Sequence, residues 1–374
     1  MRSIRLESVD QAIDAVKSGS NLLPVGAQTK PLLGLLPADG CLLKCDGLCG
    51  ITEYEPTEFT FTAQAGTPIS EIQRVLGQQN QFLPFDPPFS AEGAPLGGAI
   101  ASGLNGSSSL RFGGARDFVL GLHFVDGLGN LVMAGGKVVK NAAGFDLPKF
   151  MVGSYGRFGL LTDLTLKVFP RPDCQATLGF EGEPEQHLEA IRRLIRIPLE
   201  MDAIDICDSR LLIRIGGPER TIQSAGQRIE SVIGRSPDQW LQDGDEEAAL
   251  WEDANRFSWQ RQDTLLKIPT QLNQVADWIR LAGEFGLSYR VCIGGQLIYV
   301  SGSQGEVKLF SERLAALRQH FLLIRGSQPK GESCSKGIVG TDDGIFGKLS
   351  QSIKRALDPN GRFPALGGSS NQNT

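Results

Sequence analysis

The chain has 374 residues, of which 41% are hydrophobic and 21% charged, and its formal net charge at pH 7 is −5. This composition predicts a folded protein of about two domains, and the absence of a polybasic block argues against nucleic acid as a partner. No run reaches the roughly 18 apolar residues of a membrane span, and the start, MRSIRLESVD, lacks a signal-peptide core. We therefore expect a cytoplasmic protein without a membrane span, and peripheral membrane contact through partners stays open.

The first part of the chain is rich in glycine and contains few predicted helices. Residues 1–170 hold 24 of the 46 glycines. Ser8 and Gln11 form a capping pattern that predicts a helix up to Gly19, and Thr67-Pro68 predicts a second helix ending at Gly77. Apolar runs such as FTFTAQAG and FVLGLHFVD predict strands between the loops. This is an α+β pattern, and no strand–GxGxxG–helix unit predicts a Rossmann domain.

A boundary is predicted at LKVFPRPDC (166–174), where a strand-like run ends at two prolines. We place a first domain at 1–172, a second at 173–330 and a carboxyl-terminal helix and tail at 331–374, which we expect to pack back on the first domain. The tail begins with a predicted helix over about 345–357, which leads to DPNGRF.

The second domain contains an internal repeat of the pattern β-α-β-β-α. The first copy has predicted strands at 176–180, 201–206 and 211–216 and helices at 185–196 and 219–233. The second copy has strands at 264–268, 289–293 and 296–301 and helices at 270–285 and 304–319. The repeat predicts an antiparallel sheet with helices on one face and pseudo-twofold symmetry. We interpret the acidic segment between the copies, 238–253, as a solvated excursion.

Three of the seven cysteines, Cys41, Cys45 and Cys49, form the one cluster in the sequence. Their four-residue spacing does not match the usual CxxC arrangements of zinc or iron–sulfur ligands, and no fourth ligand lies nearby. Small buried residues in a reducing compartment are the better interpretation. We assign no metal.

Three glycine-containing stretches form a candidate nucleotide site. PVGAQTKPLLG (24–34) is a strand end followed by a loop in which backbone amides, Thr29 and Lys30 can surround a phosphate. In PLGGAIASGLNG (95–106), Gly97 and Gly98 allow a close approach of the backbone to a diphosphate. A plain turn explains either loop alone. Together with GSYGRFGLLTDLTLKV (153–168), they favour a long dinucleotide.

Four stretches follow one another in this order: PVGAQTK, GTPISEIQRVL, PLGGAIASGLNG and GGKVVKNAAGFDLPKFMVGSYGRFGLLTDLTLKVFPRP. On these stretches rests a resemblance of the chain to the PCMH-type FAD-binding domain of the vanillyl-alcohol oxidase superfamily. More closely, the chain resembles the family of FAD-binding E subunits of glycolate oxidase, also called glycolate dehydrogenase. The resemblance covers residues 1–172, and LDPNGRF loosely. It implies an α+β fold with two α+β subdomains in the FAD domain, followed by an α+β cap domain.

The resemblance implies noncovalent FAD and a set of cofactor-binding residues. These are Val25, Gly26, Ala27, Gln28, Thr29, Lys30, Gly97, Gly98, Ser102, Gly153, Gly156, Gly159 and Leu161. The first nine would hold the diphosphate, and the later glycines with Leu161 would line the adenosine side. We expect Lys140, Asn141 and Asp146 to organise the fold rather than contact the ligand.

The chain departs from the family pattern at several positions. Ala27 and Gln28 stand where many relatives have glycines, and Pro364 where many have asparagine. Relatives that oxidise 2-hydroxy acids alone carry clustered histidines, because the reaction needs a base or a metal to take the hydroxyl proton. Here His123 lies in a strand-like run and His187 and His320 lie on predicted helices, where surface positions are favoured. No catalytic residue can be named from the sequence.

The sequence therefore suggests the FAD-binding subunit of a glycolate (2-hydroxy acid) dehydrogenase complex, acting with a second flavin subunit and an iron–sulfur subunit. One alternative is a self-sufficient FAD-dependent, D-lactate-like dehydrogenase, which would need Tyr289, Tyr299 or Arg325 near the flavin. The other is a non-catalytic assembly protein that has lost FAD. Substrate, electron acceptor and stoichiometry stay open.

Overall fold

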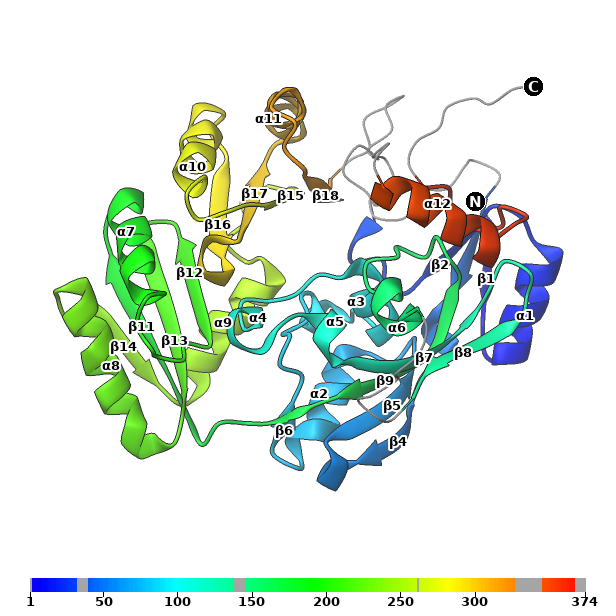
Figure 1. The fold of residues 1–374 in the computed structure, drawn as a ribbon, viewed down its shortest axis with the longest axis horizontal. Helices are drawn as coiled ribbons and strands as arrows, with labels where there is room; N and C mark the ends of the chain where they lie inside the picture. The colour runs from blue at the N-terminus through cyan, green and yellow to red at the C-terminus, as the bar shows by residue number, and fades with distance from the viewer. Residues whose placement is uncertain (1, 32–39, 137–144, 261, 327–344, 367–374) are drawn as a thin grey trace.

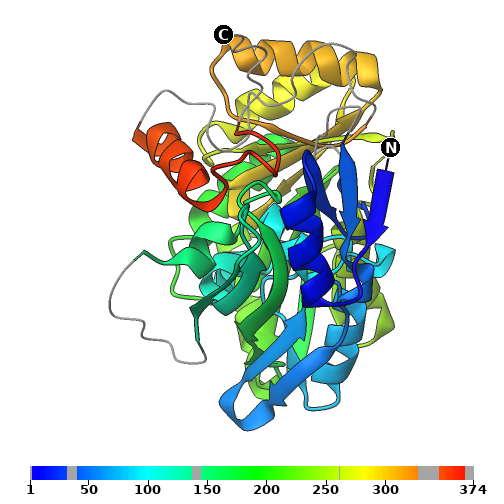
Figure 2. The ribbon, with the colours of Figure 1, turned by 90° about the vertical axis from the view of Figure 1, so that its right-hand side faces the viewer.

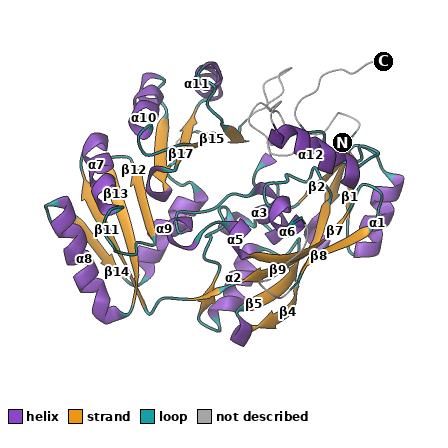
Figure 3. Ribbon diagram, viewed as in Figure 1, coloured by secondary structure: helices purple, strands orange, loops and turns teal. Residues whose placement is uncertain are grey.

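The computed structural model describes residues 2–31, 40–136, 145–260, 262–326 and 345–366. Its elements form two parts (Figures 1 and 3): an amino-terminal part up to residue 170 and an eight-stranded sheet with its helices over 174–325. The 90° view in Figure 2 shows helix α11 of the second part above the strands of the first part. No helix among the described residues is long and apolar enough to cross a membrane.

The amino-terminal part begins with a small parallel sheet in the order β1-β3-β2. Its strands are β1 (Arg2–Arg5), β2 (Leu22–Val25) and β3 (Cys41–Lys44), with helix α1 (Val9–Ser18) between the first two. The Ser8 side chain accepts a hydrogen bond from the amide of Gln11 at 3.2 Å, so Ser8 caps α1 as predicted. A short 3-10 turn, η2 (Cys45–Gly47), follows β3.

A five-stranded antiparallel sheet forms the larger layer of the amino-terminal part, in the order β4-β5-β9-β7-β8. Its strands are β4 (Ile51–Glu55), β5 (Thr60–Gln64), β7 (Val119–Val125), β8 (Leu131–Gly135) and β9 (Leu160–Lys167). The helices with it are α2 (Ile69–Gly77), α3 (Leu96–Ser102), α4 (Ser109–Phe112), α5 (Ala115–Phe118) and α6 (Leu147–Met151). Ile69, Ile72 and Leu76 of α2 are fully buried, so one face of this predicted helix packs into the core.

The remaining elements of the amino-terminal part are short. β6 (Gln81–Phe82) pairs with β10 (Phe169–Pro170), and the 3-10 turns η3 (Pro56–Glu58) and η4 (Ser90–Glu92) lie in the loops.

The second part is a single antiparallel sheet in the order β14-β11-β13-β12-β16-β17-β15-β18. The first half has β11 (Cys174–Glu181), α7 (Pro184–Leu194), β12 (Ala203–Cys207), β13 (Arg210–Gly217), α8 (Glu219–Ile233) and β14 (Gln239–Gln242). The second half has β15 (Thr264–Pro269), α10 (Val275–Glu284), β16 (Ser288–Cys292), η5 (Ile293–Gly295), β17 (Leu297–Gly302), α11 (Gln304–Ala316) and β18 (Leu322–Arg325). The predicted repeat is confirmed, and each half gains a further strand.

The two halves meet through β12 and β16, which pair only at Ile206↔Val291 and Cys207↔Arg290. The repeat helices α7, α8, α10 and α11 cover one face of the sheet, where the largest apolar core lies. On each strand, the alternate side chains point to the other face. Asp205, Arg290 and Tyr299 lie on this other face, which we call the inner face because Ser107 of the amino-terminal part bonds to Asp205 there.

The acidic segment between the repeats is not a solvated excursion, so that interpretation was wrong. It forms β14 and helix α9 (Asp245–Arg256), and α9 packs against the inner face through Trp251 and Ala254. Glu247 is buried and accepts two hydrogen bonds from Arg214, at 2.8 and 2.7 Å. The buried carboxylate has a cationic partner, which allows an acidic residue to lie inside the protein.

An aromatic and aliphatic cluster fills the junction between the two parts. It contains Phe89 and Leu104 from the amino-terminal part and Phe257, Leu265 and Tyr299 from the second part. The predicted helix at 345–357 is present as α12 (Ile345–Leu357), and its Ile353 and Leu357 pack against the core of the five-stranded sheet.

Candidate functional site

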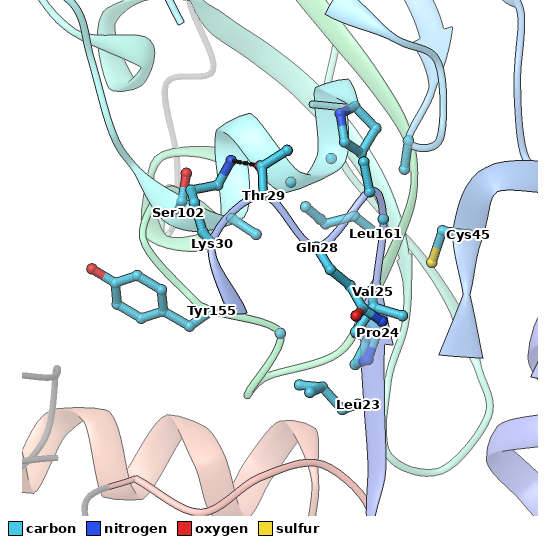
Figure 4. Close-up of a pocket in the computed structure, with 18 of the residues that line it drawn as sticks. Leu23, Pro24, Val25, Gln28, Thr29, Lys30, Cys45, Ser102, Tyr155 and Leu161 are labelled. Atoms are coloured by element: carbon cyan, nitrogen blue, oxygen red, sulfur yellow. Dashed lines mark hydrogen bonds between the residues drawn. The ribbon is translucent and has the colours of Figure 1, made fainter. Parts of the chain in front are cut away.

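A cavity lies in the amino-terminal part, between three stretches of chain (Figure 4). Loop 26–30 leaves β2 and forms one wall, α3 with Pro95 forms the second, and residues 155–161 form the third. Apolar side chains contribute much of the remaining lining, namely Leu23, Pro24, Val25, Ala65, Ala101 and Leu161. The cavity therefore has a polar loop at one wall and apolar surfaces around it.

The structure brings together nearly all the residues that the resemblance assigned to FAD. Lining the cavity are Val25, Gly26, Ala27, Gln28, Thr29, Lys30, Gly97, Gly98, Ser102, Gly156, Gly159 and Leu161. Gly153 is not in the lining: its amide donates to the Ile100 carbonyl at 3.0 Å and its φ is +79°. Gly153 thus forms a turn that holds the third stretch against α3.

The first loop offers unpaired backbone donors. The amide hydrogens of Ala27, Gln28, Thr29 and Lys30 have no acceptor among the described residues. Gln28 adopts a left-handed φ of +53°, so the loop departs from extended geometry here. Successive free amides in such a turn form a concave site for an anion.

Gly97 and Gly98 are adjacent but have different surroundings. A Cβ on Gly97 would lie 2.7 Å from Cβ of Ala65 and 2.9 Å from its carbonyl oxygen, so Gly97 permits close packing of α3 on the end of β5. A Cβ on Gly98 would meet only the Pro95 ring, at 3.4 Å, an ordinary contact. Gly98 is the glycine of the two that leaves space open in the cavity.

Lys30 is the cationic group of the cavity wall. Its Nζ donates to Oγ1 of Thr29 at 3.1 Å and lies 5.3 Å from the centre of the Phe89 ring. Burial lowers the pKa of Lys30 to about 8, with a further lowering by Arg325 and an opposing effect of Glu92. A bound anion would favour the protonated amine.

Cys45 also lines the cavity, which the sequence interpretation did not anticipate. It enters from the turn after β3, and its Sγ lies 3.5 Å from the Leu43 carbonyl oxygen. Burial raises the pKa of the Cys45 thiol to about 12, so the thiolate that would attack a flavin ring is scarce at neutral pH. No histidine is among the residues that line the cavity.

We therefore expect acid denaturation of the flavin-loaded protein to release all of the flavin into the supernatant as FAD. The physical reason is the protonated state of Cys45 and the absence of histidine from the cavity wall. Absorbance of supernatant and pellet at flavin wavelengths measures this. Flavin retained by the wild-type pellet but released from a Cys45→Ser variant would reveal a thioether bond and contradict the expectation.

The histidines lie elsewhere. His123 is half-exposed on β7, with Nδ1 3.8 Å from Asp163, and His320 is exposed. His187 is buried and its Nε2 lies 2.9 Å from the Ser209 carbonyl oxygen, so its predicted surface position was wrong. Among the described residues, no group of three or more metal-binding side chains is close enough to hold an ion.

The three side chains considered as acid/base candidates differ in position. Tyr289 packs with the core on the helix-covered face of the sheet, away from the amino-terminal part. Tyr299 lies on the inner face, but it is buried in the junction cluster and burial raises its pKa well above the usual range. Arg325 pairs with Glu92 and donates to the Thr29 carbonyl. None of them lines the cavity.

Lys267 is a titratable residue that the sequence analysis missed. It lies on β15 directly opposite Tyr299, and burial lowers its pKa to about 8. A single lysine inside the apolar run TLLKI was the available signal, because a charge in a core strand is costly without a reason.

The residues expected to organise the fold are only partly described. Lys140 and Asn141 lie outside the described residues. The Asp146 carboxylate accepts a hydrogen bond from the amide of Lys149 at 3.1 Å and so caps α6, which is a structural role.

The donor set fits FAD. The loop amides, which have no acceptor in the described part of the chain, and Lys30 suit the two phosphates; the open space at Gly98 admits them close to the backbone, and the apolar walls suit the rings.

Comparison with known proteins agrees with this geometry. Residues 4–135 match the family described as FAD binding domain. The chain is 38% identical over 232 residues to glycolate oxidase subunit GlcE of Escherichia coli (strain K12), covering 62% of this chain and 65% of that one. It is 25% identical over 303 residues to subunit GlcD of Bacillus subtilis (strain 168), covering 73% and 64%. The matches thus span just under two thirds of these relatives.

Solved structures show the same fold at low sequence identity. An alkyldihydroxyacetonephosphate synthase superposes with a TM-score of 0.69 at 15% identity, covering 96% of this chain and 76% of the other. The structure of FgChi7B superposes with a TM-score of 0.69 at 14% identity, covering 97% and 90%. Residues 4–135 are thus similar to the FAD binding domain family, and the chain is related in sequence to glycolate oxidase subunit GlcE.

Proposed function

We propose that this chain is the FAD-binding subunit of a complex that oxidises glycolate or a related small 2-hydroxy acid, and that it holds FAD without a covalent bond. The observation that carries the proposal is loop 26–30, which lines one cavity together with Gly98 and whose amides at residues 27–30 have no acceptor among the described residues. The relationship to glycolate oxidase subunits supports the substrate class.

Bound FAD supplies the acceptor for a hydride from the carbon that carries the substrate hydroxyl. The chain's own residues bind and orient it. The amides of loop 26–30 and the Lys30 ammonium hold the diphosphate, and the apolar walls around Leu161 and Ala101 exclude water from the rings. These residues account for cofactor binding.

The cavity offers few groups that could take the proton from the substrate hydroxyl. The titratable residues that line the cavity are Lys30, Cys45 and Tyr155. Burial raises the pKa of Cys45 to about 12 and also raises that of Tyr155, while Lys30 is held by Thr29 and the Phe89 ring. Because the cavity lining offers no suitable general base, we infer that the subunits of the complex have different roles. Substrate oxidation would occur mainly on a second flavin subunit, and electron transfer through an iron–sulfur subunit.

A second candidate is a self-sufficient 2-hydroxy acid dehydrogenase. Lys267 favours it, because burial lowers the pKa of this amine to about 8, which suits it to take a proton; it lies on the inner face of the sheet, outside the lining of the cavity. Its neighbour Tyr299 has a hydroxyl with no partner among the described residues.

We expect the isolated, FAD-loaded chain to show little bleaching of its flavin by glycolate or D-lactate under anaerobic conditions. Adding the partner subunits should restore turnover, because the isolated chain places no strong base at the cavity. Flavin absorbance after anaerobic mixing measures this. Rapid and complete reduction of the isolated chain, abolished by Lys267→Met, would instead establish the self-sufficient dehydrogenase.

A further inference from the structure

Arg325 lies at the edge of the eight-stranded sheet, yet its side chain contacts loop 26–30. Its Nε donates to the Thr29 carbonyl oxygen at 2.9 Å, and its Nη2 pairs with the Glu92 carboxylate. The guanidinium carbon lies 4.1 Å from the centre of the Phe89 ring. β18, which carries Arg325, is the strand at the end of the sheet nearest the amino-terminal part (Figure 1).

The contact with Thr29 sets the direction of a neighbouring donor. The Thr29 carbonyl and the Lys30 amide belong to one planar trans peptide, in which C=O and N–H point in opposite directions. A carbonyl held by Arg325 therefore turns the Lys30 amide hydrogen away from Arg325. That hydrogen has no acceptor among the described residues, and Lys30 lines the cavity.

Two cations share one aromatic ring at this point. Lys30 Nζ and the Arg325 guanidinium both lie near Phe89, and Glu92 is the carboxylate that faces them. The other titratable groups of the cavity, Cys45 and Tyr155, have raised pKa values and are uncharged at neutral pH. One positive charge is therefore left uncompensated among these groups, next to the loop amides that have no acceptor among the described residues.

We propose that Arg325 is a positioning residue for FAD binding: it fixes the Thr29–Lys30 peptide and so couples the affinity for FAD to the docking of the eight-stranded sheet. Because coupling is reciprocal, bound FAD stabilises that docking by the same factor. The proposal goes beyond the function proposed above but rests on its FAD site.

The test compares FAD dissociation constants, from quenching of flavin fluorescence, for the wild type and four variants. R325Q should raise the dissociation constant about tenfold, since it loses a charge-assisted bond to the loop. R325K keeps the charge but cannot contact Thr29, Glu92 and Phe89 at once. Its dissociation constant for FAD should lie between those of the wild type and R325Q. R313Q removes an arginine from an exposed position of α11 and should match the wild type.

The pH profile separates positioning from a general loss of stability. Wild-type affinity should be constant at low pH and fall as pH rises through about 8, where Lys30 loses its proton. R325Q should move this midpoint upward, because the repulsion from Arg325 is gone. E92Q should move it downward. A change in folding stability alone would leave the midpoint in place.

Each outcome bears on one proposal. If the wild type binds no FAD at all, the proposed function is wrong. If the wild type binds FAD while R325Q keeps both the affinity and the pH midpoint of R313Q, Arg325 does not position the loop. A variant that only melts earlier, with unchanged affinity in its folded fraction, also overturns the proposal.

Discussion

Replacing Gly98 with valine should weaken FAD binding at least 100-fold, which corresponds to about 2.8 kcal/mol. The new side chain would occupy the open space at α3 that the cavity leaves for the diphosphate. The fold should survive, because a Cβ at Gly98 makes only an ordinary contact with Pro95, and valine is no worse than glycine in a helix. Titration with FAD and thermal melting of the FAD-free protein measure the two effects separately.

The neighbouring glycine provides the matched control. Gly97→Ala should lower the stability of the FAD-free protein, since its Cβ would press on the side chain and carbonyl of Ala65. The two adjacent positions should thus behave in opposite ways, one losing ligand affinity and the other stability. If Gly98→Val binds FAD as the wild type does, Gly98 is a helix residue without a role in the site.

Replacing Asp205 with alanine should lower the free energy of unfolding by about 3–5 kcal/mol, because it leaves Arg290 buried without a counter-ion. The Asp205 side chain is fully buried and that of Arg290 is 5% exposed, with Nε to Oδ2 at 3.0 Å. Oδ2 also accepts from Ser107 Oγ at 2.5 Å, and Oδ1 from the Ile293 amide at 3.2 Å. Urea denaturation of the FAD-free protein measures the loss.

The control for Asp205 is Asp277→Ala on α10, where the carboxylate pairs with Arg280 at an exposed position. Surface pairs contribute little, so this variant should stay within about 1 kcal/mol of the wild type. An Asp205→Ala variant as stable as the Asp277→Ala control would show that Arg290 finds another partner and that the inner-face network does not hold the parts together.

Local patterns in the sequence predicted much of the fold. The helix starts at Ser8 and Pro68, and the element order of the repeat, follow from periodicity and capping, which act within a few residues. The prediction for the acidic segment 238–253 was wrong because it considered only the charges of that segment. The buried Glu247 carboxylate is paired with Arg214 and accepts from Thr177, which both come from strands distant in the sequence.

The candidate site shows the same limit. Loop 26–30 and Gly98 carry a signal in their own sequence, since glycines and small residues at a strand end are locally unusual. Cys45 carries no such signal, and neither the contact of Arg325 with Thr29 nor the burial around Lys267 can be derived locally, because these environments arise from strands and turns that meet only in the folded protein. Even adjacent Gly97 and Gly98 could not be told apart without the position of Ala65.

The narrow pairing between β12 and β16 has a consequence for the order of folding. Every strand pair of the first half closes within residues 174–242, and every pair of the second half within 264–325. The chain entropy lost in closing these loops is therefore offset by strand pairing within each half, before the two halves meet. The seam at Ile206 and Cys207 can form last, between two partly built half-sheets, so the duplication shortens the conformational search of a 374-residue chain.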